Sequence, residues 1–295
     1  MNGVVIIDKP AGLTSHDVVN CVRRILGQRA VGHLGTLDPA ATGVLPIVLG
    51  NLTRLAQFYA HSEKTYEGVI RFGFATDTYD ADGEPTTPQQ AVQLNCDEVR
   101  ALAAQFQGII EQIPPPFSAK KIAGVPAYKL ARKHKEVDLK PVQIEIKEFE
   151  ILAADGDRAN FRAHVASGTY IRSIAHEMGQ KLGCGAHLAN LRRTSVAEFA
   201  IADAHTLEAL EAARRQGTAE SLFVHPRNLV PQLPSVGATE EAAALIRSGR
   251  SVNLPEMTRA PQVKVFYGQR ELIAIATRVA GTLFHAGIVF GRSSD

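Results

Sequence analysis

The chain has 295 residues, of which 45% are hydrophobic and 21% are charged. This composition suffices for a sizeable buried core, and the length predicts one large domain with a smaller one, or two domains of medium size. The net charge at neutral pH is only +2. The field of the whole molecule is therefore a weak argument for a nucleic-acid partner, and local clusters of charge carry more weight.

The three cysteines, Cys21, Cys96 and Cys184, are far apart and form no CxxC pair. Neither a zinc knuckle nor a disulfide framework is indicated, so we expect reduced thiols. The N-terminus lacks the basic start and long apolar stretch of a signal peptide, and no run approaches the roughly 20 apolar residues of a membrane span. These features predict a cytoplasmic protein without a membrane partner.

The first part of the chain predicts strands and helices in turn. Thr14 or Ser15 is placed to cap a helix whose apolar residues recur at helical spacing, and Gly27 is placed to end it. Alternation in a later strand puts Tyr66 on the same face as Ile70. The expected elements, in chain order, are a strand at 4–7, the helix from 14 to 27, a short helix at 52–59, a strand at 66–72 and a helix at 97–107.

The later part predicts a hairpin, a helix and a small β domain. Two alternating runs flank the turn Asp155-Gly156, and residues 231–235 have the composition of a linker. Beyond it, Thr239 is placed to cap a short helix that ends near Gly249. The expected elements are strands at 143–152 and 158–165, helices at 171–182 and after 239, and strands at 263–267, 271–279 and 283–290.

Residues of about 114–140 interrupt this pattern. Three consecutive prolines precede a stretch, 118–135, that is rich in lysine and arginine and has no acidic residue. Such a stretch is able to neutralise phosphates, which makes binding salt-dependent, although the same composition is typical of a solvated surface loop. The first interpretation predicts an inserted RNA clamp, with candidate contacts Lys120, Lys121, Lys129, Arg132 and Lys133.

The most informative segment is residues 32–44, GHLGTLDPAATGV. Pro39 holds the residues before it in extended geometry and removes a donor, so Asp38 is presented from a well-defined loop. Backbone freedom or close approach is supplied by Gly32, Gly35 and Gly43. Aspartate before proline is also typical of an ordinary turn. The apolar run 44–49 anchors the loop to a core, however, which is a common way to build a site.

This segment resembles the TruB family of tRNA pseudouridine synthases. Four more motifs occur in the family's order, namely Asp8–Ser15, Lys64–Tyr66, Gly73–Gly83 and Gly168–Arg172. The resemblance implies an α+β fold with a mixed, largely antiparallel central sheet flanked by helices. It also implies a catalytic domain at 1–232 and a small PUA-like β-barrel domain at 236–295 that binds RNA. Family members convert the uridine at position 55 of the tRNA T loop to pseudouridine.

The resemblance makes Asp38 the catalytic group. Isomerisation needs one carboxylate, which either attacks C1′ or C6 of the nucleotide or abstracts a ribose proton, and the sequence does not choose among these routes. An aspartate with an ordinary pKa near 3.9 is ionised at neutral pH, so we expect no unusual tuning. Arg172 matches the family's arginine and would orient Asp38 through a charge-assisted, even bidentate, pair. Without its motif, Arg172 would be interpreted as a surface arginine.

Other residues of the motifs are candidate contacts to the substrate. Tyr66 offers a ring for stacking of uracil, worth about 1 to 3 kcal/mol, and a hydroxyl for proton transfer. Tyr170 and Leu191 would line the pocket, and all three residues are also typical of a packed core. By the resemblance, His33 would stabilise the base after it is flipped out of the folded RNA, a step that costs a few kcal/mol.

The sequence pattern leaves two alternative functions open. A glycoside-cleaving enzyme would usually need a second carboxylate to activate water, and none is obvious near Asp38 in the sequence. A noncatalytic tRNA-binding or tRNA-folding protein would use only the basic stretch and the C-terminal domain. The acids of residues 77–83 do not match a calcium loop, and no phosphate-binding glycine motif or zinc-protease helix occurs. We therefore expect no metal and no cofactor, and a monomer whose partner is the T arm of tRNA.

Overall fold

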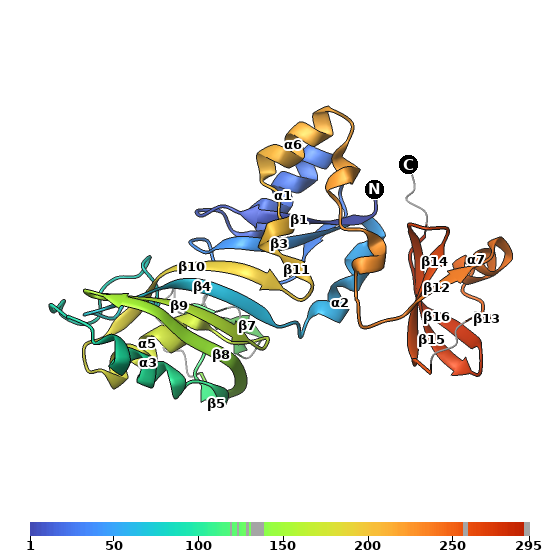
Figure 1. Cartoon of the computed structure of the whole chain (residues 1–295). Coiled ribbons are helices and arrows are strands. Elements are labelled where there is room, and N and C mark those ends of the chain that lie inside the picture. Colours follow the sequence, from blue (N-terminus) through green and yellow to red (C-terminus); the bar gives the residue numbers. More distant parts are fainter. Residues whose placement is uncertain (119, 123, 128–129, 131–138, 256–258, 292–295) are drawn as a thin grey trace.

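The computed structural model describes the chain except for residues 119, 123, 128–129, 131–138, 256–258 and 292–295. Two sheets, one long and twisted and the other smaller and curled, form the framework of the described chain (Figure 1). The large sheet has the strand order β1-β3-β10-β4-β9-β8-β5, with β2 added to β3 and β11 to β10. Of its pairings, only that of β3 with β10 is parallel. The predicted α+β fold with a mixed, largely antiparallel sheet is confirmed.

The strands of the large sheet are β1 (Gly3–Lys9), β2 (Val31–His33), β3 (Thr42–Leu49), β4 (Lys64–Phe72), β5 (Gly108–Gln112), β8 (Val142–Asp155), β9 (Arg158–Val165), β10 (Ala186–Val196) and β11 (Phe199–Ala200). Central strand β10 pairs with β3 on one side and with β4 on the other. Its Arg193 is in register with Gly43 of β3 and with Tyr66 of β4. This arrangement brings three separated segments of the sequence to one place.

Helices cover the large sheet. They are α1 (Ser15–Leu26), α2 (Ala56–Tyr59), α3 (Cys96–Ala104), α5 (Ile171–Lys181) and α6 (Leu207–Arg215), with 3-10 turns η1 (Gly50–Leu55), η2 (Ile201–Asp203), η3 (Ala219–Leu222) and η4 (Pro226–Asn228). The first helix begins with a capping box, because Thr14 Oγ1 accepts from Asp17 N and the Asp17 carboxylate accepts from Thr14 N. It ends at Gly27, whose φ is 64°. The sequence prediction of this helix is therefore correct, and Thr14 rather than Ser15 is the cap.

The smaller sheet has the order β12-β14-β15-β16-β13 and curls into a half-barrel against helix α7 (Glu240–Arg247). Its strands are β12 (Ser235–Ala238), β13 (Val252–Asn253), β14 (Gln262–Tyr267), β15 (Glu271–Ala280) and β16 (Leu283–Val289). Thr239 caps α7 as predicted, since its hydroxyl accepts from Ala242 N. Strand β12 starts inside the predicted linker and pairs in parallel with β14.

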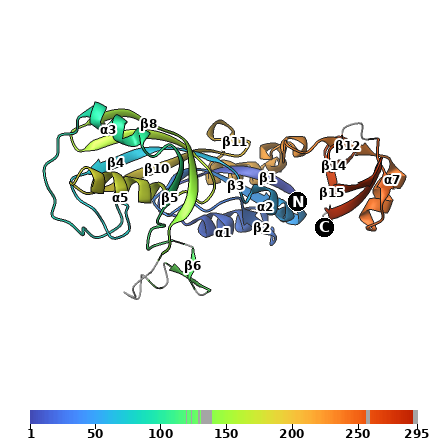
Figure 2. The ribbon, with the colours of Figure 1, turned by 90° about the horizontal axis from the view of Figure 1, so that it is seen from below.

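One hydrophobic cluster joins the two sheets. Phe266, Leu272 and Phe290 of the C-terminal region pack with Val48 and Leu52 of the large-sheet region. The C-terminal sheet lies at one end of the molecule (Figure 2). The short hairpin of β6 (Lys121–Ile122) and β7 (Val125–Pro126) projects from the large-sheet region. The division of the chain into domains at 1–232 and 236–295 stays a prediction.

Candidate active site

The loop that carries Asp38 connects β2 to β3 and is tied down on both sides of the aspartate. Ser15, in the first turn of α1, donates its hydroxyl to the carbonyl of Leu37 at 3.0 Å and accepts from the Leu37 amide at 2.8 Å. Buried Lys9 donates its ammonium to the carbonyl of Pro39 at 3.0 Å. The residues immediately before and after Asp38 are thus fixed by side chains from α1 and β1, and neither contact was foreseen from the sequence.

Two glycines of the loop adopt backbone angles that other residues rarely tolerate. Gly35 has a φ of 107° and Gly43 a φ of 100°. Gly32 differs, because it lies inside β2 with no positive φ, and a Cβ there would make ordinary contacts with Val48 at 3.5 Å and Thr53 at 4.0 Å. The expected need for glycine is therefore correct for Gly35 and Gly43 and wrong for Gly32.

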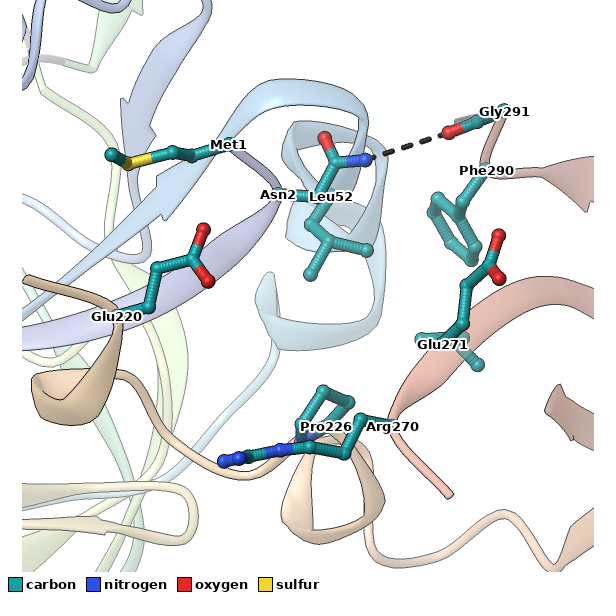
Figure 3. Close-up of a pocket in the computed structure, with 10 residues that line it drawn as sticks. Met1, Asn2, Leu52, Glu220, Pro226, Arg270, Glu271, Phe290 and Gly291 are labelled. Atoms are coloured by element: carbon teal, nitrogen blue, oxygen red, sulfur yellow. Dashed lines mark hydrogen bonds between the residues drawn. The ribbon is translucent and has the colours of Figure 1, made fainter. Parts of the chain in front are cut away.

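A cavity of about 230 Å³ opens beside this loop. Five of the predicted site residues line it, although they come from four separate stretches of sequence: Asp38, Tyr66, Tyr170 with Arg172, and Leu191. A larger cavity of about 570 Å³ lies between the N-terminus and the C-terminal sheet (Figure 3). None of the predicted site residues lines that larger cavity. Chemistry rather than size therefore identifies the smaller cavity as the candidate active site.

Arg172, in the first turn of α5, contacts Asp38 directly. Its Nε lies 3.0 Å from Asp38 Oδ2, and only 7% of its side chain is exposed. The contact uses one nitrogen and one oxygen, so it is not the two-pronged pair that the sequence allowed. The rest of the guanidinium donates to the carbonyls of Thr78 and Phe117, at 3.2 and 3.1 Å. Arg172 is accordingly a buried cation held in one orientation towards the carboxylate.

Asp80 is a second carboxylate at the site that the sequence analysis did not assign there. Its Oδ2 lies 3.4 Å from Arg172 Nη1, so that Arg172 lies between two acids. Its Oδ1 accepts from the hydroxyl of Thr78 at 2.5 Å and from the amide of Asp82 at 3.2 Å. The expectation that these acids organise a turn is correct for Oδ1 of Asp80, whereas Oδ2 faces Arg172.

The environment of Asp38 changes its acidity. Burial raises the pKa of the Asp38 carboxyl, the Arg172 guanidinium opposes that rise, and Asp80 adds to it. The expectation of an ordinary pKa for Asp38 is therefore wrong, because its surroundings raise the pKa. At the same time 45% of the Asp38 side chain is open to solvent, because it faces the cavity. The carboxylate is accordingly both poorly solvated and accessible to a ligand.

Tyr66 and Tyr170 form parts of the cavity wall. Tyr66 is 7% exposed, and burial raises the pKa of its hydroxyl, so the phenol stays protonated at neutral pH. Tyr170 precedes α5, where its amide donates to the Oε1 of buried Gln112 at 2.8 Å and its carbonyl accepts from the Gln112 Nε2 at 3.1 Å. Half-buried Lys64 also lines the cavity, and burial lowers its pKa to about 8. Gln112 and Lys64 were not singled out by their sequence pattern.

His33 lies at the end of β2, in register with Ile47, and it is not among the residues that line the cavity. Burial lowers the pKa of its imidazole, with a contribution from the charge of Arg193. Its Nδ1 is buried, and no hydrogen bond to it is found in the part of the chain that the structure describes. The ring is therefore neutral at neutral pH and has an unused polar atom near the Asp38 loop.

Comparison with known proteins identifies the family. Residues 23–171 match the family described as "TruB family pseudouridylate synthase (N terminal domain)", and residues 172–231 match "tRNA pseudouridylate synthase B C-terminal domain". A protein of Solibacter usitatus named tRNA pseudouridine synthase B is 48% identical over 98% of this chain and its own full length. The chain belongs to the TruB family of pseudouridylate synthases. A relative of the same name from Aquifex aeolicus is 39% identical over 96% of this chain and 98% of its own length.

Solved structures agree with this membership of the TruB family. A chain of an H/ACA ribonucleoprotein bound to a substrate RNA containing 2′-deoxyuridine superposes with a TM-score of 0.72 at 25% identity, over 98% of this chain and 85% of that one. A chain of a Cbf5-Nop10-Gar1 complex gives a TM-score of 0.71 at 26% identity, over 97% of this chain and 84% of that one. The fold is thus that of a pseudouridine synthase, an RNA isomerase.

The remaining predictions for this TruB-family chain concern charge and metals. Lys120 precedes β6 and Lys121 begins it, whereas Lys129, Arg132 and Lys133 lie outside the described residues. Within the described residues, no group of three or more His, Cys, Asp and Glu side chains is arranged to hold a metal ion. The described helices include none that is long and apolar enough to cross a membrane.

Proposed function

We propose that this chain isomerises the uridine at position 55 of the tRNA T loop to pseudouridine. Membership of the TruB family supports the reaction, and relatives named tRNA pseudouridine synthase B support tRNA as the substrate. The observation that carries the proposal is the accessible carboxylate of Asp38, held by Arg172 at the edge of a cavity that admits a flipped base. A noncatalytic tRNA-binding role is not favoured by these findings.

The reaction is an exchange of bonds within one nucleotide. The C1′–N1 bond breaks, the uracil turns, and a C1′–C5 bond forms, while C5 loses a proton and N1 gains one. Asp38 begins this exchange as a nucleophile or as a base. Arg172 keeps the carboxylate in place, and its charge favours the ionised form against the effect of burial.

The other residues at the site hold the substrate. Tyr66 presents a ring for the uracil and, with its raised pKa, a protonated hydroxyl that is a donor rather than a base. Tyr170 and Leu191 form further walls of the cavity. Because His33 lies outside the cavity, its proposed task is to stabilise the RNA after the base has been flipped out.

The second carboxylate does not favour hydrolysis of a glycoside. Asp80 is close to the site, but one of its oxygens faces Arg172 and the other accepts from Thr78 and Asp82. Both oxygens of Asp80 are therefore engaged by protein groups, which favours a structural role over activation of water. The site therefore supports rearrangement of the nucleotide rather than release of the base.

We further infer that residues 118–135 and the domain at 236–295 contribute contacts to the tRNA, the latter in the manner of a PUA domain. Lysines and arginines in the first segment would neutralise phosphates, so the affinity for tRNA should fall with salt. That the protein acts as a monomer in the cytoplasm stays a prediction, which size-exclusion chromatography with and without tRNA and cell fractionation would test.

The proposal is tested with tRNA carrying tritium at C5 of its uracils. Isomerisation must release tritium into water from one uridine per molecule, while the nucleotide composition by mass stays the same. A tRNA in which position 55 is cytidine is the matched control and should release none. Absence of release from the normal tRNA would reject the enzyme assignment, and free uracil among the products would favour the glycosidase instead.

A further inference from the structure

Arg193 is the largest fully buried side chain in the described part of the molecule, with an exposure of 0%. It lies in the middle of β10, between Gly43 of β3 and Tyr66 of β4. Burial of a cation costs several kcal/mol unless its charge is compensated. Among the described residues, however, Arg193 forms no ion pair with a carboxylate. The function proposed above does not account for this residue.

Backbone carbonyls compensate the charge instead. Arg193 Nε donates to the carbonyl of Val44 at 2.8 Å, Nη1 to that of Thr36 at 3.2 Å, and Nη2 to that of Gly35 at 3.0 Å. Gly35 and Thr36 precede Asp38 in the loop, and Val44 follows it. One planar guanidinium therefore bridges the two ends of the segment that carries the catalytic carboxylate.

The loop also packs closely against the main chain of Arg193, in addition to its hydrogen bonds with the guanidinium. A Cβ on Gly43 would overlap the carbonyl oxygen of Arg193, and it would also have to tolerate a φ of 100°. A Cβ on Gly35 would meet the guanidinium at 3.5 Å. The loop is thus in contact with Arg193 at two places: Gly43 packs against its main chain, and Gly35 packs against its guanidinium.

We propose that Arg193 is a further positioning residue for Asp38, beside Ser15, Lys9 and Arg172. It sets the backbone of residues 35–44 so that the carboxylate faces Arg172 and the substrate. Stability alone does not explain a buried cation, since an apolar side chain of similar volume often serves the fold as well or better. A catalytic group needs placement within about 0.5 Å, and an error of about 1 Å costs on the order of 100-fold in rate. Fixing both ends of the loop provides that accuracy.

The inference rests on the proposed function, and the test compares two substitutions of Arg193 with one control. Arg193→Met removes all three donors at similar length, whereas Arg193→Lys keeps the charge but has no fork to span the three carbonyls. Arg71→Met is the matched control, because Arg71 is an ion-paired arginine on a neighbouring strand, bound to Asp157 far from the loop. Tritium release is followed in single turnover at saturating tRNA, and tRNA affinity by filter binding.

We expect Arg193→Met to lower the single-turnover rate on the order of 100-fold, while the affinity for tRNA changes by less than about twofold, since the residue does not touch RNA. Arg193→Lys should lie between Arg193→Met and the wild type, and Arg71→Met should match the wild type. Measurements are made well below the unfolding temperature of each variant. If Arg193→Met does not fold, Arg193→Lys decides, with a loss of rate at unchanged affinity still required.

Two results would overturn the proposal. One is a rate within about threefold of the wild type in both folded variants, which would make Arg193 a residue of the fold alone. The other is a loss of tRNA affinity equal to the loss of rate, which would place the loop in binding rather than in positioning of Asp38. Failure of the proposed function is distinct from both, because the wild type itself would then release no tritium.

Discussion

Two lysine–carboxylate sites in this molecule are built alike and used differently. Near each acid, a buried lysine donates to two backbone carbonyls, and burial lowers the pKa of that lysine while the acid acts against the shift. The pairs are Lys9 with Asp38 in the candidate active site, and Lys264 with Glu198 at the junction of the two sheets.

The two sites differ in how much of the carboxylate is accessible to a ligand. At the junction, Glu198 Oε1 accepts from the hydroxyl of Tyr59 at 2.5 Å and from the amide of Val230 at 3.0 Å, so the acid is used in holding the chain. In the active site, Asp38 keeps 45% of its side chain open. A lysine beside a carboxylate therefore stabilises the junction where Glu198 is hydrogen-bonded within the protein. At the candidate active site, the same pairing leaves the Asp38 carboxylate accessible to a ligand.

The largest expected effect is that of Asp38→Asn in the open site. Turnover should fall on the order of 10⁴-fold, as it does when a catalytic group is removed from other enzymes, while the affinity for tRNA is retained. Single-turnover tritium release and filter binding measure the two quantities. Asp97→Asn, at a carboxylate that is 92% exposed on α3, is the control and should behave as the wild type. A near-normal rate in Asp38→Asn would remove this residue from the mechanism.

The same substitution has a consequence for stability. The pKa of Asp38 is raised in the folded state, so its charged form at neutral pH costs the fold stability, and that cost disappears as the pH falls and the group binds a proton. Asp38→Asn should therefore unfold no earlier than the wild type at neutral pH. Calorimetry that shows a clearly lower unfolding temperature would contradict the burial of this carboxylate.

At the junction, Lys264→Met should act on stability instead of chemistry. Two buried carbonyls lose their donor, each at about 1 kcal/mol, so the free energy of unfolding should fall by about 2 kcal/mol. Urea unfolding measures the change, and Lys140→Met, at an exposed lysine, is the control. A single-turnover rate that falls as steeply as in Arg193→Met would show that the two sites are not separate in function.

His33→Ala tests the edge of the open site. Because His33 lies outside the cavity and its proposed role is in stabilising the flipped RNA, we expect a loss of about tenfold in rate, which corresponds to about 1.4 kcal/mol. The loss must be far smaller than in Asp38→Asn. His61→Ala, at an exposed histidine, is the matched control. Equal abolition of activity in His33→Ala and Asp38→Asn would indicate a chemical role for the imidazole.

The last expected effect is on the pH dependence of stability. The pKa of Lys9 falls from 10.5 to about 8 on folding, so between these values the unfolded chain binds more protons and the free energy of unfolding rises with pH. Lys9→Met should reduce this rise between about pH 8 and pH 10.5, as measured by urea unfolding at several pH values. An unchanged slope would mean that Lys9 is better solvated than its position indicates.

Local patterns foretold much of the fold. The helix cap at Thr14 or Ser15, the hairpin at 143–165 and the strands from residue 263 onward were predicted because each depends on residues that are neighbours in the sequence. Central strand β10 was missed, and so were α6 and β12. Arg192, Arg193, Thr194 and Ser195 interrupt the apolar pattern of β10, and no local rule shows that a buried arginine will find carbonyls on a distant loop.

The candidate site divides in the same way. The sequence by itself pointed to Asp38, Tyr66 and Arg172 as candidates, because the motifs around them are local features of the chain. Tertiary structure alone decided their relations: Arg172 reaches Thr78 across 94 positions, and Arg193 reaches Gly35 across 158. It also raised the pKa of Asp38 and placed His33 outside the cavity. Desolvation and long-range hydrogen bonds depend on distance in space, on which sequence spacing carries no information.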